Sequence, residues 1–218
     1  MARSLLLDLD GTLVDTVPDL AAVLNRLMHA RGLPEFNRNQ VASMVGDGVG
    51  VLVARAFNAR GQPPDSTAVA EFSADYEANI AVKSTLYPHV SQALEALARD
   101  GWRLAVCTNK PERAARALLK ALGLLPLMSA VGGGDSFPVR KPDPGHLRAT
   151  LLLAMGTLDQ AVALGDHRND VLAAAGAGIP CIFAGWGYGS PGMPEGCTAI
   201  ANDILEAVQI ANRLLPAE

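Results

Sequence analysis

The chain has 218 residues, of which 50% are hydrophobic and 18% are charged, and its formal net charge is −4. This length allows one large or two small domains with a sizeable core, while the negative charge and the lack of a Lys/Arg cluster argue against nucleic acid as a main partner. No apolar run approaches the length of a membrane span, and the N-terminus lacks the long apolar region of a signal peptide, so we expect neither.

The first predicted element is a short buried strand over residues 5–7, and it ends in two acids. Asp8 and Asp10 stand one residue apart, directly before Gly11. Alternation along a strand places both side chains on the same side. Paired carboxylates at the end of a buried strand are costly unless a cation or a reaction uses them. The alternative is an ordinary polar turn, because Asp and Gly are common turn residues.

Residues 16–85 carry helical patterns and no clear strand. Apolar residues at helical spacing predict a helix over residues 18–31, with Thr16 as its cap and Pro18 in its first turn. Further helical stretches are predicted over residues 37–45, 51–57 and 66–81, separated by the glycine-rich turn 46–50 and the turn 61–65. This segment interrupts an alternating pattern of strands and helices, so we interpret it as an inserted domain.

The alternation resumes at residue 86. Strands are predicted over residues 103–107, 127–131, 161–164 and 179–183, and helices over residues 90–99, 111–122, 144–155, 171–177 and 202–215. Asp143 and Pro144 are favourable helix-start residues. The pattern predicts a Rossmann-like parallel α/β core, formed by residues 1–15 and 86–218 and covered on both faces, with residues 16–85 as an inserted all-helical domain.

Polar residues follow several of the predicted strands. Ligands of parallel sheets bind beyond the carboxyl ends of the strands, so these residues are expected to meet in one crevice, which Lys141 could reach from the start of a helix. The strand-end residues are Asp8, Asp10, Thr108, Asn109, Asp166 and Asp170.

The order and separation of these motifs resemble those of the haloacid dehalogenase superfamily. The motifs are Asp8-Leu9-Asp10-Gly11-Thr12, Thr108-Asn109, Lys141-Pro142, and Gly165-Asp166 with Asp170 four residues on. The resemblance covers nearly the whole chain, and the helical insert resembles the cap of the phosphoglycolate phosphatase-like branch. His167 departs from the pattern, because relatives usually have a small hydroxyl residue there. The resemblance implies a Mg²⁺-dependent phosphatase.

The resemblance also implies a role for each motif residue. Asp8 is the nucleophile that forms an aspartyl-phosphate, and Asp10 is the general acid and base. Mg²⁺ is a hard ion that takes oxygen ligands, here the carboxylates of Asp8 and Asp166 and the backbone carbonyl of Asp10. Asp170 either orients these ligands or binds the metal itself. The groups that hold the phosphoryl oxygens are Thr108, the amide of Asn109 and Lys141.

Three of these residues also have simpler interpretations. Lys141 is alternatively a solvated surface lysine, and Thr108 an ordinary hydroxyl at the end of a strand. Asp170 is alternatively an acid favoured by the dipole at the start of a helix, a role that needs no metal.

The turn that contains Gly46 and Gly48 is either a plain turn of the cap or a substrate-specificity loop that reaches over the site. In the second case Arg55 is a candidate anion contact. Exposed glycine amides can form an anion-binding concavity, which suits a short carboxylate better than a polyhydroxylated sugar. With the resemblance added, the expected substrate is a small phosphorylated metabolite, with 2-phosphoglycolate as the first choice.

Two other functions remain open at this point. A sugar phosphomutase of the same family (β-phosphoglucomutase-like) would use the same core residues, and a non-enzymatic binding protein could be built on this fold. A dehalogenase is disfavoured, because its relatives lack an acid at the place of Asp10. We expect a cytoplasmic monomer or homodimer, with Cys107 and Cys181 as buried thiols in a reducing compartment.

Overall fold

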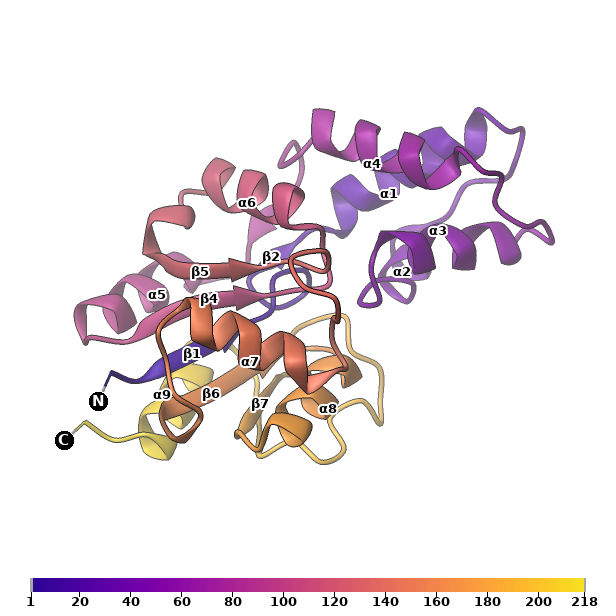
Figure 1. Cartoon of the computed structure of the whole chain (residues 1–218). Helices are drawn as coiled ribbons and strands as arrows, with labels where there is room; N and C mark the ends of the chain where they lie inside the picture. Colours follow the sequence, from indigo (N-terminus) through magenta and orange to yellow (C-terminus); the bar gives the residue numbers. More distant parts are fainter. Residues whose placement is uncertain (1, 218) are drawn as a thin grey trace.

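The computed structural model describes residues 2–217, and its centre is a parallel sheet of six strands in the order β5-β4-β1-β6-β7-β8 (Figure 1). The predicted parallel α/β fold is thereby confirmed. The strands are β1 (Ser4–Leu7), β4 (Arg103–Cys107), β5 (Met128–Gly132), β6 (Ala161–Gly165), β7 (Cys181–Ala184) and β8 (Ala199–Ala201).

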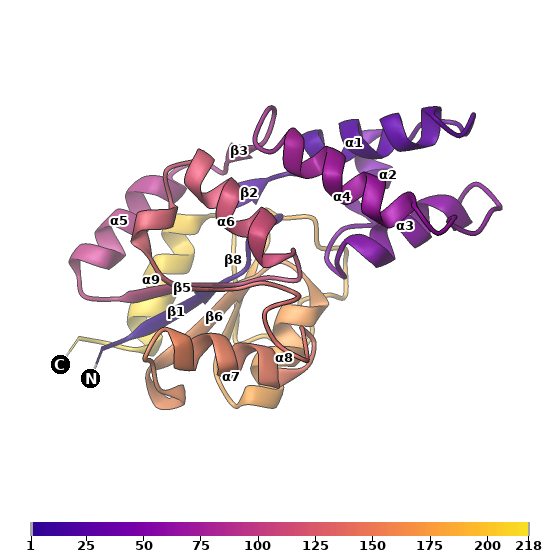
Figure 2. The same ribbon diagram turned by 45° about the horizontal axis from the view of Figure 1, so that its top comes forward.

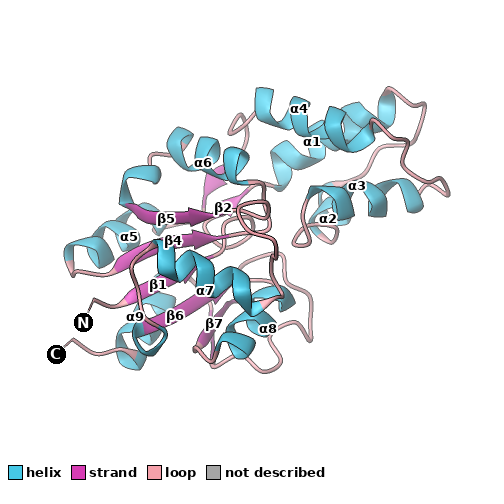
Figure 3. Ribbon diagram, in the orientation of Figure 1, coloured by secondary structure: helices cyan, strands magenta, loops and turns pink. Residues whose placement is uncertain are grey.

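Helices cover both faces of the sheet because its strands are apolar on both sides (Figure 3). Leu5 and Leu7 of β1 pack into one buried cluster with α5, α6 and α9, whereas Leu6 packs into a second cluster with α7 and α8. This alternation produces three layers. The helices are α5 (Val90–Arg99), α6 (Glu112–Ala121), α7 (Pro144–Leu153), α8 (Arg168–Ala177) and α9 (Ile204–Leu214).

Four helices form a separate group beyond one end of the sheet, on the side away from both termini (Figures 1 and 2). They share their own buried apolar cluster, to which the core helix α6 contributes Ala114. No strand lies between residues 16 and 84, all of which the structure describes. The helices are α1 (Val17–His29), α2 (Arg38–Ala42), α3 (Val49–Asn58) and α4 (Ala68–Ala78).

Two features of the fold differ from the expectation. Strand β8 extends the sheet by a sixth strand that no apolar run indicated, because it is a three-residue edge strand whose middle residue, Ile200, is half exposed. Where the chain enters and leaves the helical group, β2 (Val14–Asp15) pairs antiparallel with β3 (Thr85–Leu86). This two-stranded ribbon joins the two chain crossings.

Of the two predicted helix caps, one is present in the structure and the other is replaced by a distant residue. The Asp143 carboxylate accepts the Gly145 N–H at 2.7 Å and caps α7 as predicted. Thr16 precedes α1, but its side chain makes no capping bond. The Tyr188 hydroxyl instead accepts the N–H groups of Thr16 at 2.7 Å and Val17 at 3.1 Å. A residue far along the chain therefore caps this helix.

Cys107 and Cys181 are buried free thiols, in agreement with the expectation. None of the helices within residues 2–217 combines the length and the apolar character needed to cross a membrane.

Candidate active site

The strand order brings the predicted motif residues to one edge of the sheet. Strand β1 lies between β4 and β6, so Asp8, Thr108 and Asp166 follow three neighbouring strands. The Asp8 N–H still donates to the Leu164 carbonyl at 2.9 Å, which continues the ladder into the site. Asp8 and Thr108 also line one pocket together with Asp10 and Asn109. The expected convergence of these groups is present.

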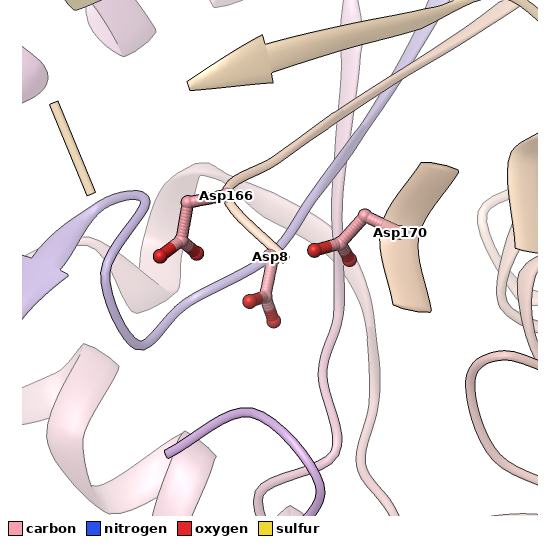
Figure 4. A group of neighbouring side chains, drawn as sticks. All are labelled: Asp8, Asp166 and Asp170. Atoms are coloured by element: carbon pink, nitrogen blue, oxygen red, sulfur yellow. The ribbon is translucent and has the colours of Figure 1, made fainter. Parts of the chain in front are cut away.

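Three buried carboxylates form the acidic centre of the site (Figure 4). Asp8, Asp166 and Asp170 each offer an oxygen, and these oxygens lie within 4.8 Å of one another. This is a donor set that suits a hard divalent cation. The metal ligands expected from the sequence included Asp10 through its backbone carbonyl; its side chain points elsewhere, and the third carboxylate of the cluster belongs to Asp170.

Both carboxylate oxygens of Asp166 accept hydrogen bonds. Its Oδ1 accepts the Thr12 hydroxyl at 3.0 Å, and its Oδ2 accepts the Tyr188 N–H at 2.7 Å. The close approach requires glycine at position 11, where φ is +87° and a Cβ would lie 2.3 Å from Asp166 Oδ2. The first motif therefore positions the acid of the fourth motif.

Lys141 is the cation of the acidic cluster, and its side chain is only 4% exposed. Its Nζ lies 2.9 Å from Asp8 Oδ1 and 2.6 Å from Asp170 Oδ1. Burial alone would lower the pKa of Lys141, but the charges of Asp170 and Asp8 outweigh it and raise that pKa. The Lys141 N–H donates to His146 Nδ1 at 3.2 Å, which fixes the loop. The solvated-lysine interpretation is therefore wrong.

The carboxylate charges of the cluster are only partly offset. Burial raises the pKa of Asp166 well above its ordinary value, and the neighbouring charges of Asp8 and Asp170 raise it further. Burial also raises the pKa of Asp170, to about 6, against the opposing effect of Lys141. Both shifts mean that a bound cation would stabilise the ionised cluster. Asp170 Oδ2 in addition accepts the His167 N–H and caps α8, so the helix-start interpretation is present, and its part in binding or orienting a metal stays a prediction.

Asp10 faces the pocket from a different direction. Its two carboxylate oxygens lie 3.0 and 3.1 Å from Nζ of Lys110, whose side chain is 3% exposed. Thr108 is buried, and its hydroxyl accepts the Lys110 N–H at 3.3 Å. The side-chain amide of Asn109 donates to the Lys141 carbonyl at 3.0 Å. These contacts tie the second motif to the first and the third.

The glycine-rich turn before α3 lines this pocket. The Gly46 carbonyl accepts hydrogen bonds from Nδ2 of Asn109 at 2.9 Å and from Nδ2 of Asn169 at 3.3 Å. Gly46 has φ of +117°, and a Cβ there would lie 2.6 Å from the His167 ring. His167, the departure from the family pattern, thus lies against the glycine-rich turn. Gly46 and Gly48 both line the pocket, and the role of this turn in substrate specificity stays a prediction.

Arg55 is placed differently from the anion contact that was expected. Its guanidinium pairs with Asp47 Oδ2 at 2.5 Å and donates to the Met44 carbonyl at 3.0 Å, and it is not among the residues that line the pocket. Asp47 Oδ1 accepts Nδ2 of Asn169 at 2.7 Å. The structure therefore places Arg55 behind the loop, and its contact with a substrate stays a prediction.

Four residues of the site were missed by reasoning from the sequence: Lys110, His146, Asn169 and Tyr188. Lys110 directly follows Thr108-Asn109, and Asn169 stands between the two acids of the fourth motif, so proximity to a motif was an available signal for both. No local signal distinguishes Tyr188, which lies in the loop after β7.

Comparison with known proteins agrees with this geometry. The family model of haloacid dehalogenase-like hydrolases matches residues 2–178. A phosphoglycolate phosphatase of Rhodospirillum rubrum is 42% identical over 213 residues, which cover 93% of this chain and 88% of that protein.

Solved structures have the same fold. The crystal structure of a predicted phosphoglycolate phosphatase from Haemophilus somnus is 31% identical, with a TM-score of 0.89, and the match covers 96% of this chain and 97% of that one. The structure of CbbY from Rhodobacter sphaeroides in complex with phosphate is 25% identical, with a TM-score of 0.81 over 94% of this chain and 96% of that one.

A parallel α/β core with four polar motifs gathered at one edge of its sheet agrees with the family model of hydrolases that the chain matches. The chain belongs to the haloacid dehalogenase-like hydrolases. The resemblance predicted from the motifs is confirmed, and with it the expected enzyme class, a phosphatase similar to phosphoglycolate phosphatases.

Proposed function

We propose that this enzyme is a Mg²⁺-dependent phosphomonoester hydrolase that acts through an aspartyl-phosphate, with 2-phosphoglycolate as its substrate. The observation that carries the proposal is one pocket in which Asp8 and Asp10 face the glycine-rich turn and the first residue of α3, Val49. The names of the similar proteins support the substrate.

The core residues divide the reaction into two steps. The Asp8 carboxylate attacks phosphorus, the bond to the leaving oxygen breaks, and Asp10 donates a proton to the departing alkoxide. Asp10 then accepts a proton from water, whose oxygen attacks the phosphoryl group. This second step releases inorganic phosphate and restores the Asp8 carboxylate. The hydroxyl of Thr108, Nζ of Lys141 and the backbone N–H of Asn109 hold the phosphoryl oxygens, because the Asn109 side chain is already bonded to the cap and to the Lys141 carbonyl.

The acidic cluster fits a divalent cation on the evidence of its donors. Three buried carboxylates approach one another, and burial raises the pKa of both Asp166 and Asp170, while Lys141 is the cation that pairs with Asp8 and Asp170 among the described residues. Asp8, Asp166 and Asp170 would hold the ion, with the backbone carbonyl of Asp10 as the ligand implied by the family. When bound, Mg²⁺ would neutralise charge between the nucleophile and the anionic phosphoryl group.

We further propose that residues 1–15 and 86–218 form the catalytic core, and that residues 16–85 form a cap that closes over it. The separate apolar cluster of α1 to α4 supports this division. The bonds from Asn109 and Asn169 to the Gly46 carbonyl support a closed arrangement, in which the turn excludes water from the site.

The cap side of the pocket favours a short anion over a sugar. The N–H groups at the start of α3 have no partner within the helix, and the residue before it, Gly48, supplies no capping side chain. The cap residues that line the pocket are Leu20, Val45, Gly46, Gly48, Val49 and Leu52, none with a polar side chain. A sugar bisphosphate would need several directed polar groups there, so the phosphomutase alternative has less support.

The substrate proposal is tested by comparing two esters. We expect kcat/KM for 2-phosphoglycolate to exceed that for glucose 1-phosphate by at least about tenfold, which corresponds to about 1.4 kcal/mol of transition-state binding. Phosphate release is measured for both under the same conditions. Equal efficiency, or a preference for the sugar phosphate, contradicts the substrate; conversion of a sugar phosphate to its isomer without phosphate release supports the mutase.

The metal proposal predicts that Mg²⁺ stabilises the protein more at pH 8 than at pH 5. Asp170 has a pKa of about 6 in the folded state against an ordinary value of 3.8. The folded protein therefore binds more protons between these values, and the stability of the metal-free protein falls as pH rises through this window. Mg²⁺ requires the ionised carboxylates, so its affinity rises over the same range.

The measurement is the melting temperature with Mg²⁺ or with a chelator at each pH. Each 1 kcal/mol of added binding free energy raises it by roughly 2–4 °C for a chain of this size. Asp170→Asn should reduce the difference between the two pH values. An equal effect of Mg²⁺ at pH 5 and pH 8 would show that these carboxylates do not hold it.

A further inference from the structure

Lys110 is a buried cation at the wall of the catalytic pocket that the phosphoryl-binding scheme does not use. Its side chain is 3% exposed, and its ammonium lies between the Asp10 carboxylate and the ring of Tyr76, whose centroid is 4.4 Å from Nζ. Tyr76 belongs to α4 of the cap, so Lys110 stands where the core and the cap meet. A buried charge is costly unless its partners compensate it. The burial of this ammonium therefore indicates a functional role in the site.

The ammonium has a hydrogen-bond donor to spare. Lysine carries three N–H donors, and Nζ of Lys110 bonds to two acceptors, the two oxygens of Asp10. Within residues 2–217 no third oxygen or nitrogen atom meets hydrogen-bond geometry with it. The ring of Tyr76 contributes a cation–π contact. The buried Tyr76 hydroxyl, which has no hydrogen-bond partner, helps to raise the pKa of Lys110 and competes with a ligand for the third donor. A ligand in the pocket could therefore bind the third donor.

The two buried lysines of the site have different partners. Lys141 does not line this pocket, and it is engaged by Asp8 and Asp170, on the side of Asp8 where we propose that the phosphoryl group binds. Lys110 is the only Lys or Arg among the described residues that line the pocket, and it contacts Asp10, the acid on the leaving-group side. Val49, the first residue of α3, lines the same pocket and adds the positive end of a helix dipole.

We propose that Lys110 is a specificity-determining residue whose ammonium binds the carboxylate of the substrate on the leaving-group side, while it holds Asp10 beside the leaving oxygen. The proposal rests on the proposed phosphatase function and extends it, because it selects phosphate esters whose alcohol part carries a negative charge. A neutral alcohol part would leave the buried third donor without a partner.

The competing interpretation is that Lys110 only anchors Asp10. An anchor would affect every alkyl phosphate equally, because each needs the same proton from Asp10. A carboxylate-binding residue would affect an anionic ester far more than a neutral one. The two interpretations are therefore separated by a matched pair of substrates: 2-phosphoglycolate and 2-hydroxyethyl phosphate, which has a hydroxymethyl group in place of the carboxylate.

The experiment measures kcat and KM for both esters with the wild type and with Lys110→Met. We expect kcat/KM for 2-phosphoglycolate to fall at least about tenfold more than kcat/KM for 2-hydroxyethyl phosphate. A difference of this size corresponds to the loss of one hydrogen bond to a charged group. It should come from a higher KM for 2-phosphoglycolate. The ratio of the two values does not depend on how much of the variant is folded. Lys110→Gln, which removes the charge but retains a donor for Asp10, serves the same test if the Met variant is inactive.

Two control variants separate a contact from a general effect of charge. Lys120→Met removes an exposed lysine in the last turn of α6, the helix that begins shortly after Lys110. Arg140→Met removes an exposed cation that approaches Gly48 without lining the pocket. Both controls should retain the wild-type ratio, and an equal loss in Arg140→Met would contradict a specific role for Lys110.

The outcomes also separate this inference from the proposed function. A wild type that releases phosphate from neither ester contradicts the proposed function itself. A wild type that hydrolyses both, with the same ratio in the Lys110 variants, contradicts this inference alone and leaves Lys110 as an anchor for Asp10.

Discussion

Asp8→Asn should abolish turnover, lowering kcat by at least about 10⁴-fold. The neutral amide is a poor nucleophile and cannot form the acyl-phosphate bond on which the proposed mechanism depends. The side chain is buried and makes an ion pair with Lys141, so the substitution also leaves that ammonium with Asp170 alone. The measurement is phosphate release under saturating Mg²⁺, together with trapping of phosphoenzyme after rapid mixing with labelled substrate.

The matched control is Asp159→Asn, the same chemical change at an exposed position, which should retain full activity and a normal phosphoenzyme signal. Near-normal activity of Asp8→Asn would show that the covalent mechanism is wrong. Lost turnover with an intact phosphoenzyme signal would assign the nucleophile to another residue.

The place of the site could be predicted from the sequence because its main residues stand at strand ends. Asp8, Thr108 and Asp166 directly follow apolar runs, and the apolar runs became β1, β4 and β6. Parallel strands align their carboxyl ends, so no knowledge of side-chain packing was needed to bring these residues together. Strand β8 was not predicted, because its three residues carry too little apolar character to be distinguished from a loop.

The charge pairing of the site could not be predicted in the same way. Lys110 and Asp10 are 100 positions apart, and whether the lysine faces Asp10, solvent or the cap depends on the direction of a long side chain. The Tyr188 hydroxyl caps α1 from a position more than 170 residues away. Such contacts follow from tertiary packing, which hydrophobic periodicity does not encode.

Arg55 illustrates the limit of reasoning from residue type alone. A cation near a glycine-rich loop is a reasonable anion contact, but Asp47 stands in the same loop and pairs with the guanidinium first. Among the described residues that line the pocket, the positive charge is that of Lys110, which directly follows Thr108 and Asn109, the residues proposed to bind the phosphoryl group.

Lys141→Met should lower both activity and stability. The substitution leaves the carboxylates of Asp8 and Asp170 buried without their shared cation, and removing one partner of a buried ion pair costs roughly 3–5 kcal/mol. Loss of a preorganised charge beside the phosphoryl group should lower kcat by about 10²–10³-fold. Unfolding in urea with a chelator present measures the stability, and phosphate release at saturating Mg²⁺ measures the activity.

A double variant separates the two effects of this substitution. Lys141→Met with Asp170→Asn removes one of the unpaired charges, so it should recover part of the lost stability. It should recover none of the lost activity, because Nζ of Lys141 is still missing from the phosphoryl site. Lys83→Met, at an exposed position, should match the wild type in both measurements. Recovery of activity in parallel with stability would mean that Lys141 acts only by holding the acidic cluster together, and the direct contact with the phosphoryl group would then be wrong.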